Sequence, residues 1–318
     1  MESRQRVSVV IPVYRDGPRA VGLAKALRES PGYSREIHEI ILVDDGSSDG
    51  TAEFLSSQTG QFARVVALPG NVGRSGARNA GASQASGDLI LFIDCDCLPA
   101  TTEFITVHLD HWGDHVAATI GHVVGNGGGF WDRYQSEASL RRRRQHAKGV
   151  YYAGSSQNLM VRRTAFIECG GFDTRYVTYG FEDRDLQIRL SAHGAIVWAD
   201  EAVVRHMDEL SLSGVARKMR EAGGHAAEVF QAQHPAEYIQ LGYAALDVDR
   251  HPLLRVFAAV AGYILPVSAR CTDAILHRSW LPYAVKRALV RAQTAASFLA
   301  GTGSRSTPDH ADDRATRA

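Results

Sequence analysis

The 318-residue chain has little cysteine and no excess of charge of either sign. Its four cysteines are too few and too scattered for a disulfide framework, and Cys95 and Cys97 lack the spacing of a Cys-x-x-Cys redox or zinc pair. We expect these two to be small buried residues, as free cysteines often are. The 35 basic and 35 acidic residues cancel, so no global field favours nucleic acid as a partner.

The sequence also lacks a hydrophobic run long enough to cross a membrane. The longest uncharged apolar run, residues 256–269, is shorter than the ~20 residues that a spanning helix needs. The first residues lead directly into a predicted strand and contain no apolar core of a signal peptide. We therefore expect a cytoplasmic protein.

Strands and helices alternate along the first part of the chain. The run of β-branched and aliphatic residues at 7–13 has no polar alternation and is typical of a strand buried on both faces. Further strands are predicted at 37–43, 64–68 and 88–93. Helical segments separate them. This order predicts an α/β fold with a mainly parallel sheet flanked by helices on both faces. Further segments are expected as helices at 101–112, 131–144, 163–169, 181–192, 213–233 and 253–300, the last broken at Pro266 and Pro282, and as strands at 116–124, 156–161, 195–199 and 202–205.

Two aspartates follow the fourth predicted strand. Asp94 and Asp96 are spaced i, i+2, so in a strand they would face one side together at its carboxyl edge. Carboxylates that close repel each other unless a cation lies between them. Mg²⁺ and Mn²⁺ bind oxygen ligands and substrate phosphates, and α/β folds bind ligands at this edge. The pair predicts a metal–diphosphate site; a strand followed by a polar turn is the alternative.

Four blocks in this order resemble the family 2 glycosyltransferases with the GT-A fold. They are VSVVIPVY at 7–14; ILVDDGS at 41–47; NVGRSGARN at 71–79 with Gly87-Asp88 and Asp94-Cys95-Asp96; and GGFD at 170–173 with GFEDRDLQIRL at 180–190. The resemblance covers about residues 6–210 and implies a Rossmann-like GT-A domain. It also implies inverting, metal-assisted transfer of a hexosyl or N-acetylhexosaminyl group from a nucleotide-sugar donor, with a UDP-sugar favoured. The acceptor is expected to be a hydroxyl of a glycan, a lipid-linked molecule or a small molecule.

The resemblance assigns residues to the nucleotide. It places the base beside Pro12 and Tyr14, with Asp44 and Asp45 hydrogen-bonding the base and ribose. Asp45 has an alternative role as the cap of the helix that follows, since aspartate favours that position. Arg78 is expected to contact the diphosphate, because a guanidinium group suits bidentate oxyanion contacts, or else to form a surface salt bridge.

The resemblance also implies the metal ligands and the base. Asp96 is expected to bind Mn²⁺ or Mg²⁺ directly, with Asp94 on the ribose or sharing the ion and His206 as a third ligand or a structural residue. Asp183 is expected to be the general base and Glu182 to contact the acceptor. Both open a predicted helix, whose dipole stabilises an anionic carboxylate.

Other charged side chains are expected to be structural or solvated. Asp185 and Arg189, at i and i+4, are predicted to pair on a solvated helix face. The neighbouring histidines His108, His111 and His115 are not expected to bind metal, and the first two are expected to face solvent from one helix. The basic run at 141–144 is expected on a solvated helix face or, alternatively, against an acceptor phosphate.

The C-terminal part is basic and amphipathic. Residues 250–300 hold seven basic side chains against one acidic side chain, Asp273, among large apolar residues that include Trp280. Such helices can lie on an anionic membrane surface, here the inner face, or pack on the protein or on a second subunit. We expect a catalytic domain at 1–245, a helical extension at 246–301 and a disordered tail at 302–318.

Two rival functions stay open at this stage. One is a binding protein that keeps the nucleotide-sugar fold without catalysis. The other is a nucleotidyltransferase, which would show a glycine-rich phosphate loop with Lys or Arg after the first strand, where this chain offers only Arg15. The Gln-x-x-Arg-Trp block associated with processive synthases is absent, which favours addition of one sugar or a few.

Overall fold

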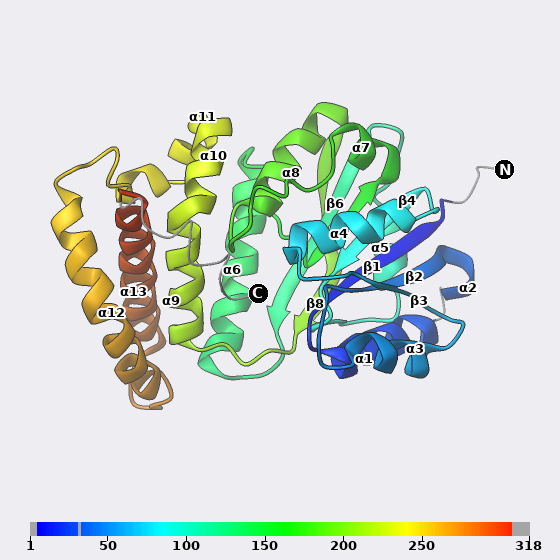
Figure 1. The fold of residues 1–318 in the computed structure, drawn as a ribbon, viewed down its shortest axis with the longest axis horizontal. Coiled ribbons are helices and arrows are strands. Elements are labelled where there is room, and N and C mark those ends of the chain that lie inside the picture. Colours follow the sequence, from blue (N-terminus) through cyan, green and yellow to red (C-terminus); the bar gives the residue numbers. More distant parts are fainter. Residues whose placement is uncertain (1–4, 31–32, 307–318) are drawn as a thin grey trace. The chain divides into compact units, whose positions relative to one another are not determined.

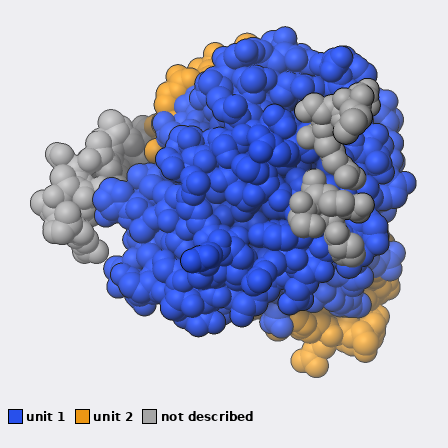
Figure 2. All heavy atoms as spheres, turned by 90° about the vertical axis from the view of Figure 1, so that its right-hand side faces the viewer, with its two compact units in different colours: residues 1–174, 182–209 blue, residues 175–181, 210–318 orange. Residues whose placement is uncertain are grey.

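The computed structural model describes residues 5–30 and 33–306, which form two compact units. Unit 1 comprises residues 1–174 and 182–209, and unit 2 comprises residues 175–181 and 210–318, coloured blue and orange in Figure 2. The domain boundary expected at residue 245 therefore falls inside unit 2.

Unit 1 is built on one eight-stranded sheet in the order β3-β2-β1-β4-β7-β6-β8-β5 (Figure 1). The pairs β1/β2, β1/β4, β2/β3 and β6/β8 are parallel, whereas β7 runs antiparallel to β4 and β6, and β5 antiparallel to β8. The predicted mainly parallel sheet is thus confirmed. The strands are β1 (Val7–Val13), β2 (Ile37–Asp44), β3 (Arg64–Ala67), β4 (Leu89–Ile93), β5 (Cys97–Pro99), β6 (Val116–Gly125), β7 (Asn158–Arg162) and β8 (Ala195–His206).

Helices cover the sheet on both faces, so alternate side chains of a strand enter different cores. In β1, Val9 packs in a cluster with side chains of α1, whereas Val10 packs with side chains of α4. Helix α4 approaches closely because it is made of small residues: a Cβ on Gly81 would lie 2.4 Å from Cγ1 of Val10. The helices of this unit are α1 (Gly17–Glu29), α2 (Tyr33–Glu36), α3 (Thr51–Thr59), α4 (Gly73–Gln84), α5 (Phe104–Leu109), α6 (Phe130–Ala147), α7 (Arg163–Glu168) and α8 (Glu182–Leu190).

Two strands differ from the sequence-based expectation. The segments 195–199 and 202–205 form the single strand β8, because its pairing with β6 shifts register and resumes instead of ending. The three-residue strand β5, directly after the acidic turn, was not expected. It pairs with the end of β8, with Cys97 opposite His206, and so joins the acidic turn to the predicted metal-binding histidine.

Unit 2 is helical. Helix α12 bends by 62° between Leu254–Leu265 and Ser268–Leu276, where Pro266 predicted a break, and Pro282 is the N-cap of α13. Helix α11 was not expected; Pro235 occupies its first turn, a position that proline favours. The helices are α9 (Leu212–Glu221), a π-helical turn (Ala222–Ala226), α10 (Ala227–Gln233), α11 (Pro235–Gln240), α12 (Leu254–Leu276) and α13 (Tyr283–Gly303).

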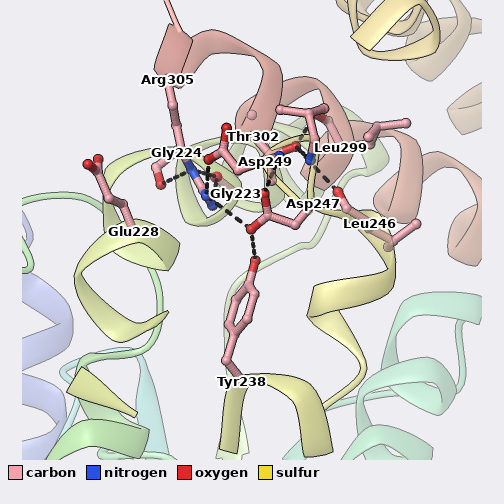
Figure 3. A network of polar contacts seen from close by, with 12 residues as sticks. Gly223, Gly224, Glu228, Tyr238, Leu246, Asp247, Asp249, Leu299, Thr302 and Arg305 are labelled. Carbon is pink, nitrogen blue, oxygen red and sulfur yellow. Dashed lines mark hydrogen bonds and ion pairs between the residues drawn. The ribbon is translucent and has the colours of Figure 1, made fainter. Parts of the chain in front are cut away.

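A buried polar network fixes the end of α13 within unit 2 (Figure 3). Arg305 donates to Oδ2 of Asp247 at 3.0 Å and to the Gly223 carbonyl at 2.6 Å, and the Tyr238 hydroxyl donates to the same Asp247 oxygen at 2.7 Å. Residues 302–306 are therefore helical and anchored, where a disordered tail was expected. The rest of that tail, 307–318, lies outside the described residues.

Candidate active site

The carboxyl ends of β1 and β2 carry the residues expected to hold a nucleotide. Pro12 lies in β1, and Tyr14, directly after the strand, is 45% exposed. Val13 of β1 pairs with Asp44 of β2. Asp44 is buried, and its Oδ1 atom has no hydrogen-bond partner within the protein. An unpaired buried carboxylate oxygen is costly, so this atom suits a ligand that donates a hydrogen bond.

Asp45 holds a neighbouring loop in place. Its Oδ1 accepts from the Val72 backbone N–H at 2.8 Å, so its alternative role as a helix cap is wrong. Helix α3 instead has Gly50 at its N-cap. Burial raises the pKa of Asp45, helped by the charge of Asp44 and opposed by the backbone N–H groups of Val72 and Gly73.

Arg78, from α4, forms a buried ion pair with Asp94. Nη2 of Arg78 lies 2.6 Å from Oδ1 of Asp94. The guanidinium carbon of Arg78 lies over the ring of Phe172, 5.3 Å from the ring centroid. The alternative of a surface salt bridge is wrong, because Arg78 is 2% exposed. Its Nε and Nη1 atoms are buried without protein partners. These two free donors suit an anionic group with several oxygens.

The sequence suggested that Asp94 and Asp96 continue strand β4, but the strand ends before them. They lie in a turn closed by a 3.0 Å hydrogen bond from the Cys97 N–H to the Asp94 carbonyl. Their carboxylates therefore have different partners: Asp94 pairs with Arg78, and Asp96 pairs with His206. Of the neighbouring cysteines, Cys97 is buried as expected, whereas Cys95 is half-buried.

A cluster of possible metal ligands forms around Asp96. Oδ2 of Asp96 lies 3.3 Å from Nε2 of His206. One ligand atom each from Asp96, His206 and Asp208 lies within 4.8 Å of the others, and no other such group occurs in residues 5–30 and 33–306. Burial raises the pKa of Asp96, but the hydrogen bond and charge of His206 outweigh it, and the net result is a pKa of about 2. Asp96 is thus anionic at neutral pH.

Sequence reasoning missed Asp208 and its partner Arg19. Arg19, from α1, forms ion pairs with Asp208 and with Asp16, the latter at 3.1 Å. Burial lowers the pKa of Arg19, but the charges of Asp208 and Asp16 outweigh it, and the net pKa is raised. The spacing of Asp208, two residues after His206, was the available signal. Nothing in the sequence placed α1 beside that segment.

Glu182 and Asp183 open helix α8, as expected. The preceding Phe181 has φ = 69°, a strained conformation for a bulky residue. Burial and the Asp183 charge raise the pKa of Glu182 to about 7, although Arg78 lowers it. Asp183 is half-buried, and its Oδ1 atom has no protein partner. Burial lowers the pKa of Arg78, but the negative charges of Asp94, Asp183 and Glu182 outweigh it, and the net pKa is raised.

The pair further along α8 is structural. Arg189 and Asp185 form the predicted ion pair, with Nη2 2.5 Å from Oδ2. The expectation of a solvated face is wrong, because Asp185 is fully buried and Arg189 also donates to the carbonyls of Cys169 and Gly171. The pair therefore joins α8 to the turn that contains Cys169 and Gly171.

His108 was expected in solvent but is fully buried. Its Nδ1 lies 2.8 Å from Oγ1 of Thr119 and its Nε2 2.8 Å from Oδ1 of Asn158. Burial lowers its pKa to about 4, so it is a neutral core residue. His111 is half-buried and His115 exposed.

Within the basic run of α6, Arg143 has a structural partner. Its Nε and Nη2 atoms donate to the two carboxylate oxygens of Asp200 at 2.7 and 2.9 Å. A bidentate pair of this kind orients the guanidinium group. The guanidinium group of Arg143 is therefore held by a residue of β8, which makes it a poor candidate to bind an acceptor phosphate.

Two protein-family models match the chain. That of glycosyl transferase family 2 matches residues 8–171, and that of the N-terminal domain of galactosyltransferase matches residues 142–206. An undecaprenyl-phosphate 4-deoxy-4-formamido-L-arabinose transferase of Serratia proteamaculans is 39% identical over 99 residues, 30% of each chain. Glycosyltransferase AglE of Haloferax volcanii is 27% identical over 179 residues, 55% of this chain and 58% of its own. The chain thus matches less than two thirds of the length of these relatives.

Solved structures share the fold. A mannosyltransferase of Pyrobaculum calidifontis, in complex with GDP-Man and Mn²⁺, has a TM-score of 0.63 at 18% identity and covers 95% of this chain and 88% of its own. Residues 1–349 of Staphylococcus aureus TarS give 0.51 at 18% identity, covering 94% and 90%. Glucosyl-3-phosphoglycerate synthase of Mycobacterium tuberculosis, with Mn²⁺ and UDP-glucose, gives 0.51 at 19% identity, covering 71% and 78%.

Proposed function

The chain belongs to glycosyl transferase family 2, and on this premise we propose that it is an inverting glycosyltransferase. It moves a sugar from a nucleotide-diphosphate donor to a hydroxyl group of an acceptor. The observation that carries the proposal is the meeting of three groups at one end of the sheet: the Asp96–His206–Asp208 cluster, the Arg78–Asp94 pair and the Asp183 carboxylate.

The donor's nucleoside is assigned to the ends of β1 and β2. The unpartnered Oδ1 of Asp44 accepts a hydrogen bond from the base or ribose, while Asp45 keeps the loop at Val72 in position. Tyr14 offers an exposed ring for the base. A UDP-sugar is our first choice, and the structural relatives with UDP-glucose and GDP-Man support the nucleotide-sugar class.

The diphosphate is assigned to Arg78 and a divalent metal. Two carboxylates and an imidazole are a suitable ligand set for Mn²⁺, and also serve Mg²⁺. When bound, the metal neutralises charge on the departing diphosphate. Arg78 donates from Nε and Nη1, the atoms that lack partners, while Asp94 holds its Nη2. Asp94 thereby positions Arg78, and it remains free to contact the ribose through its second oxygen.

Asp183 is assigned as the general base. Its unpartnered Oδ1 takes the proton from the acceptor hydroxyl as that oxygen attacks the sugar's anomeric carbon and the bond to the diphosphate breaks. Glu182, with a pKa of about 7, contacts the acceptor. The name of the Serratia relative supports a lipid-linked acceptor.

A donor panel with Mn²⁺ tests the proposal through release of nucleoside diphosphate. Asp183→Asn should keep donor affinity and lose turnover by roughly 10²–10⁴-fold, the usual contribution of a general base. Asp114→Asn, at an exposed position of the same unit, is the matched control and should turn over normally. Normal turnover by Asp183→Asn would show that the base is another residue.

The same panel separates the rival functions. A protein that binds nucleotide sugars without catalysis would bind donor and release no nucleoside diphosphate with any acceptor. A nucleotidyltransferase would release pyrophosphate from a nucleoside triphosphate. Our proposal requires diphosphate release that depends on the acceptor.

A further inference from the structure

Helix α12 of unit 2 leaves one apolar face uncovered. Six large apolar side chains repeat at intervals of three and four residues, which places them on one side of a helix. Their exposed fractions are Leu253 89%, Val256 70%, Phe257 66%, Val260 50%, Tyr263 88% and Ile264 57%. We name these six residues the α12 stripe.

The opposite side of α12 is already used for packing. The helix contacts α13 and α9, and Ala258 and Ala269 are buried at 3% and 1% exposure. Figure 1 shows α12 running alongside α13. Contiguous exposed apolar surface beside a packed face is typical of a site that binds a protein or a membrane. Trp280, in the connection between the C-terminal end of α12 and α13, is 73% exposed.

The exposed charge in this part of the chain is mainly basic, although Arg255 lies 4.0 Å from the exposed Asp249. Arginines at 250, 255, 270, 278 and 291 are exposed. Asp273, the only acidic residue in 250–300, accepts hydrogen bonds from the backbone N–H groups of Leu212 and Ser213 at 2.6 and 3.2 Å. It therefore caps α9 and does little to offset the arginines.

From this pattern we propose that the α12 stripe docks on an anionic lipid bilayer. Apolar side chains would enter the interface, Tyr263 and Trp280 would lie at headgroup level, and the arginines would bind the lipid phosphates. A second copy of the chain is a poorer occupant, because a two-fold interface here would bring like charges together. Within 5–30 and 33–306 no single helix could span a membrane by length and composition, although the two bent parts of α12 pass that test jointly.

Vesicle co-sedimentation of the full chain tests this without any donor, so it is independent of the transfer reaction. The wild type should pellet together with vesicles of phosphatidylcholine mixed with phosphatidylglycerol. It should stay in the supernatant with vesicles of phosphatidylcholine alone. The double variant Phe257→Ser/Tyr263→Ser should lose at least about ten-fold in partitioning, because burial of apolar surface drives binding. Ile239→Ser removes an apolar side chain of 54% exposure elsewhere in unit 2 and is the matched control.

A second variant tests the electrostatic part. Arg270→Glu/Arg278→Glu should weaken binding to anionic vesicles, and added salt should weaken wild-type binding in the same way. Far-UV circular dichroism verifies that each variant is folded. The proposal is overturned if the wild type stays in the supernatant with anionic vesicles. It is also overturned if sedimentation velocity shows a dimer that Phe257→Ser/Tyr263→Ser dissociates, since the stripe would then join two copies.

Discussion

Arg78 and Asp94 form an ion pair that is almost out of solvent: Nη2 lies 2.6 Å from Oδ1, and the side chains are 2% and 14% exposed. Asp94 holds one corner of the guanidinium group and leaves two donors unpartnered. The pair thus presents a fixed cation beside the acidic turn. Buried donors without partners are costly, and a ligand with several oxygens would satisfy both of them.

Removing the arginine should destabilise the fold. Arg78→Met leaves Asp94 without its counter-charge, and breaking a buried pair costs about 3 kcal/mol. Urea unfolding in the presence of a chelator measures the change. Arg74→Met, at an exposed position of the same helix, should cost less than about 1 kcal/mol. Equal effects of the two variants would contradict a buried pair.

Arg19 should compete with the metal for Asp208. In the metal-free protein its guanidinium group binds Asp208, so Arg19→Met should tighten Mn²⁺ binding. An exposed pair is worth at most about 1 kcal/mol, which limits the gain to about five-fold. Electron paramagnetic resonance of Mn²⁺ measures the affinity. Asp16→Asn, which removes the other carboxylate on Arg19, is the control and should not tighten binding. Asp208→Asn should weaken it, and unchanged affinity would remove Asp208 from the ligand set.

His108 should make the metal-free protein less stable in mild acid. Its pKa is about 4 when folded, below its ordinary value of 6.5. The unfolded chain therefore binds one more proton between these values, and stability falls as pH decreases from 6.5 to 4. The loss is roughly 3 kcal/mol. His108→Gln should lack this contribution when unfolding is measured across the range, whereas His111→Gln should keep it.

Glu182 should change the pH dependence of stability in the direction opposite to that of His108. Its pKa is about 7 when folded against 4.5 ordinarily, so the folded chain holds the extra proton between these values. Stability then falls as pH rises from 4.5 to 7, by about 3 kcal/mol in total. Relative to wild type, Glu182→Gln should gain stability at pH 8 and gain little at pH 4. A gain that is the same at both pH values would mean that Glu182 ionises normally.

The first half of the fold could be predicted because local signals agreed with tertiary structure. The strands β1 and β4 and the part of β2 from Ile40 to Val43 are apolar runs, and each strand is followed by a turn, so parallel pairing is the arrangement that the sequence favours. Strand β5 could not be predicted in this way. Its three residues have no periodicity, and it exists because it pairs with the end of β8.

Within the site, the sequence motifs proposed candidate residues, but they could not predict which side chains those residues contact. Asp96, His206 and Asp183 were chosen from motifs, and the structure places the first two 3.3 Å apart. The role of Arg19 depends on the packing of α1, which no local pattern reports. His108 was misplaced because its polar partners, Thr119 and Asn158, come from two other strands. A buried histidine is recognisable only once those strands are assembled.

Calorimetric titration of UDP into the wild-type chain, with Mn²⁺ and then with excess chelator, tests the metal–diphosphate site most directly. The proposed function predicts saturable binding with Mn²⁺ that weakens at least about ten-fold in chelator, since charge neutralisation of the diphosphate is lost. Asp96→Ala should bind weakly under both conditions. Equal affinity for UDP in Mn²⁺ and in chelator would contradict the account.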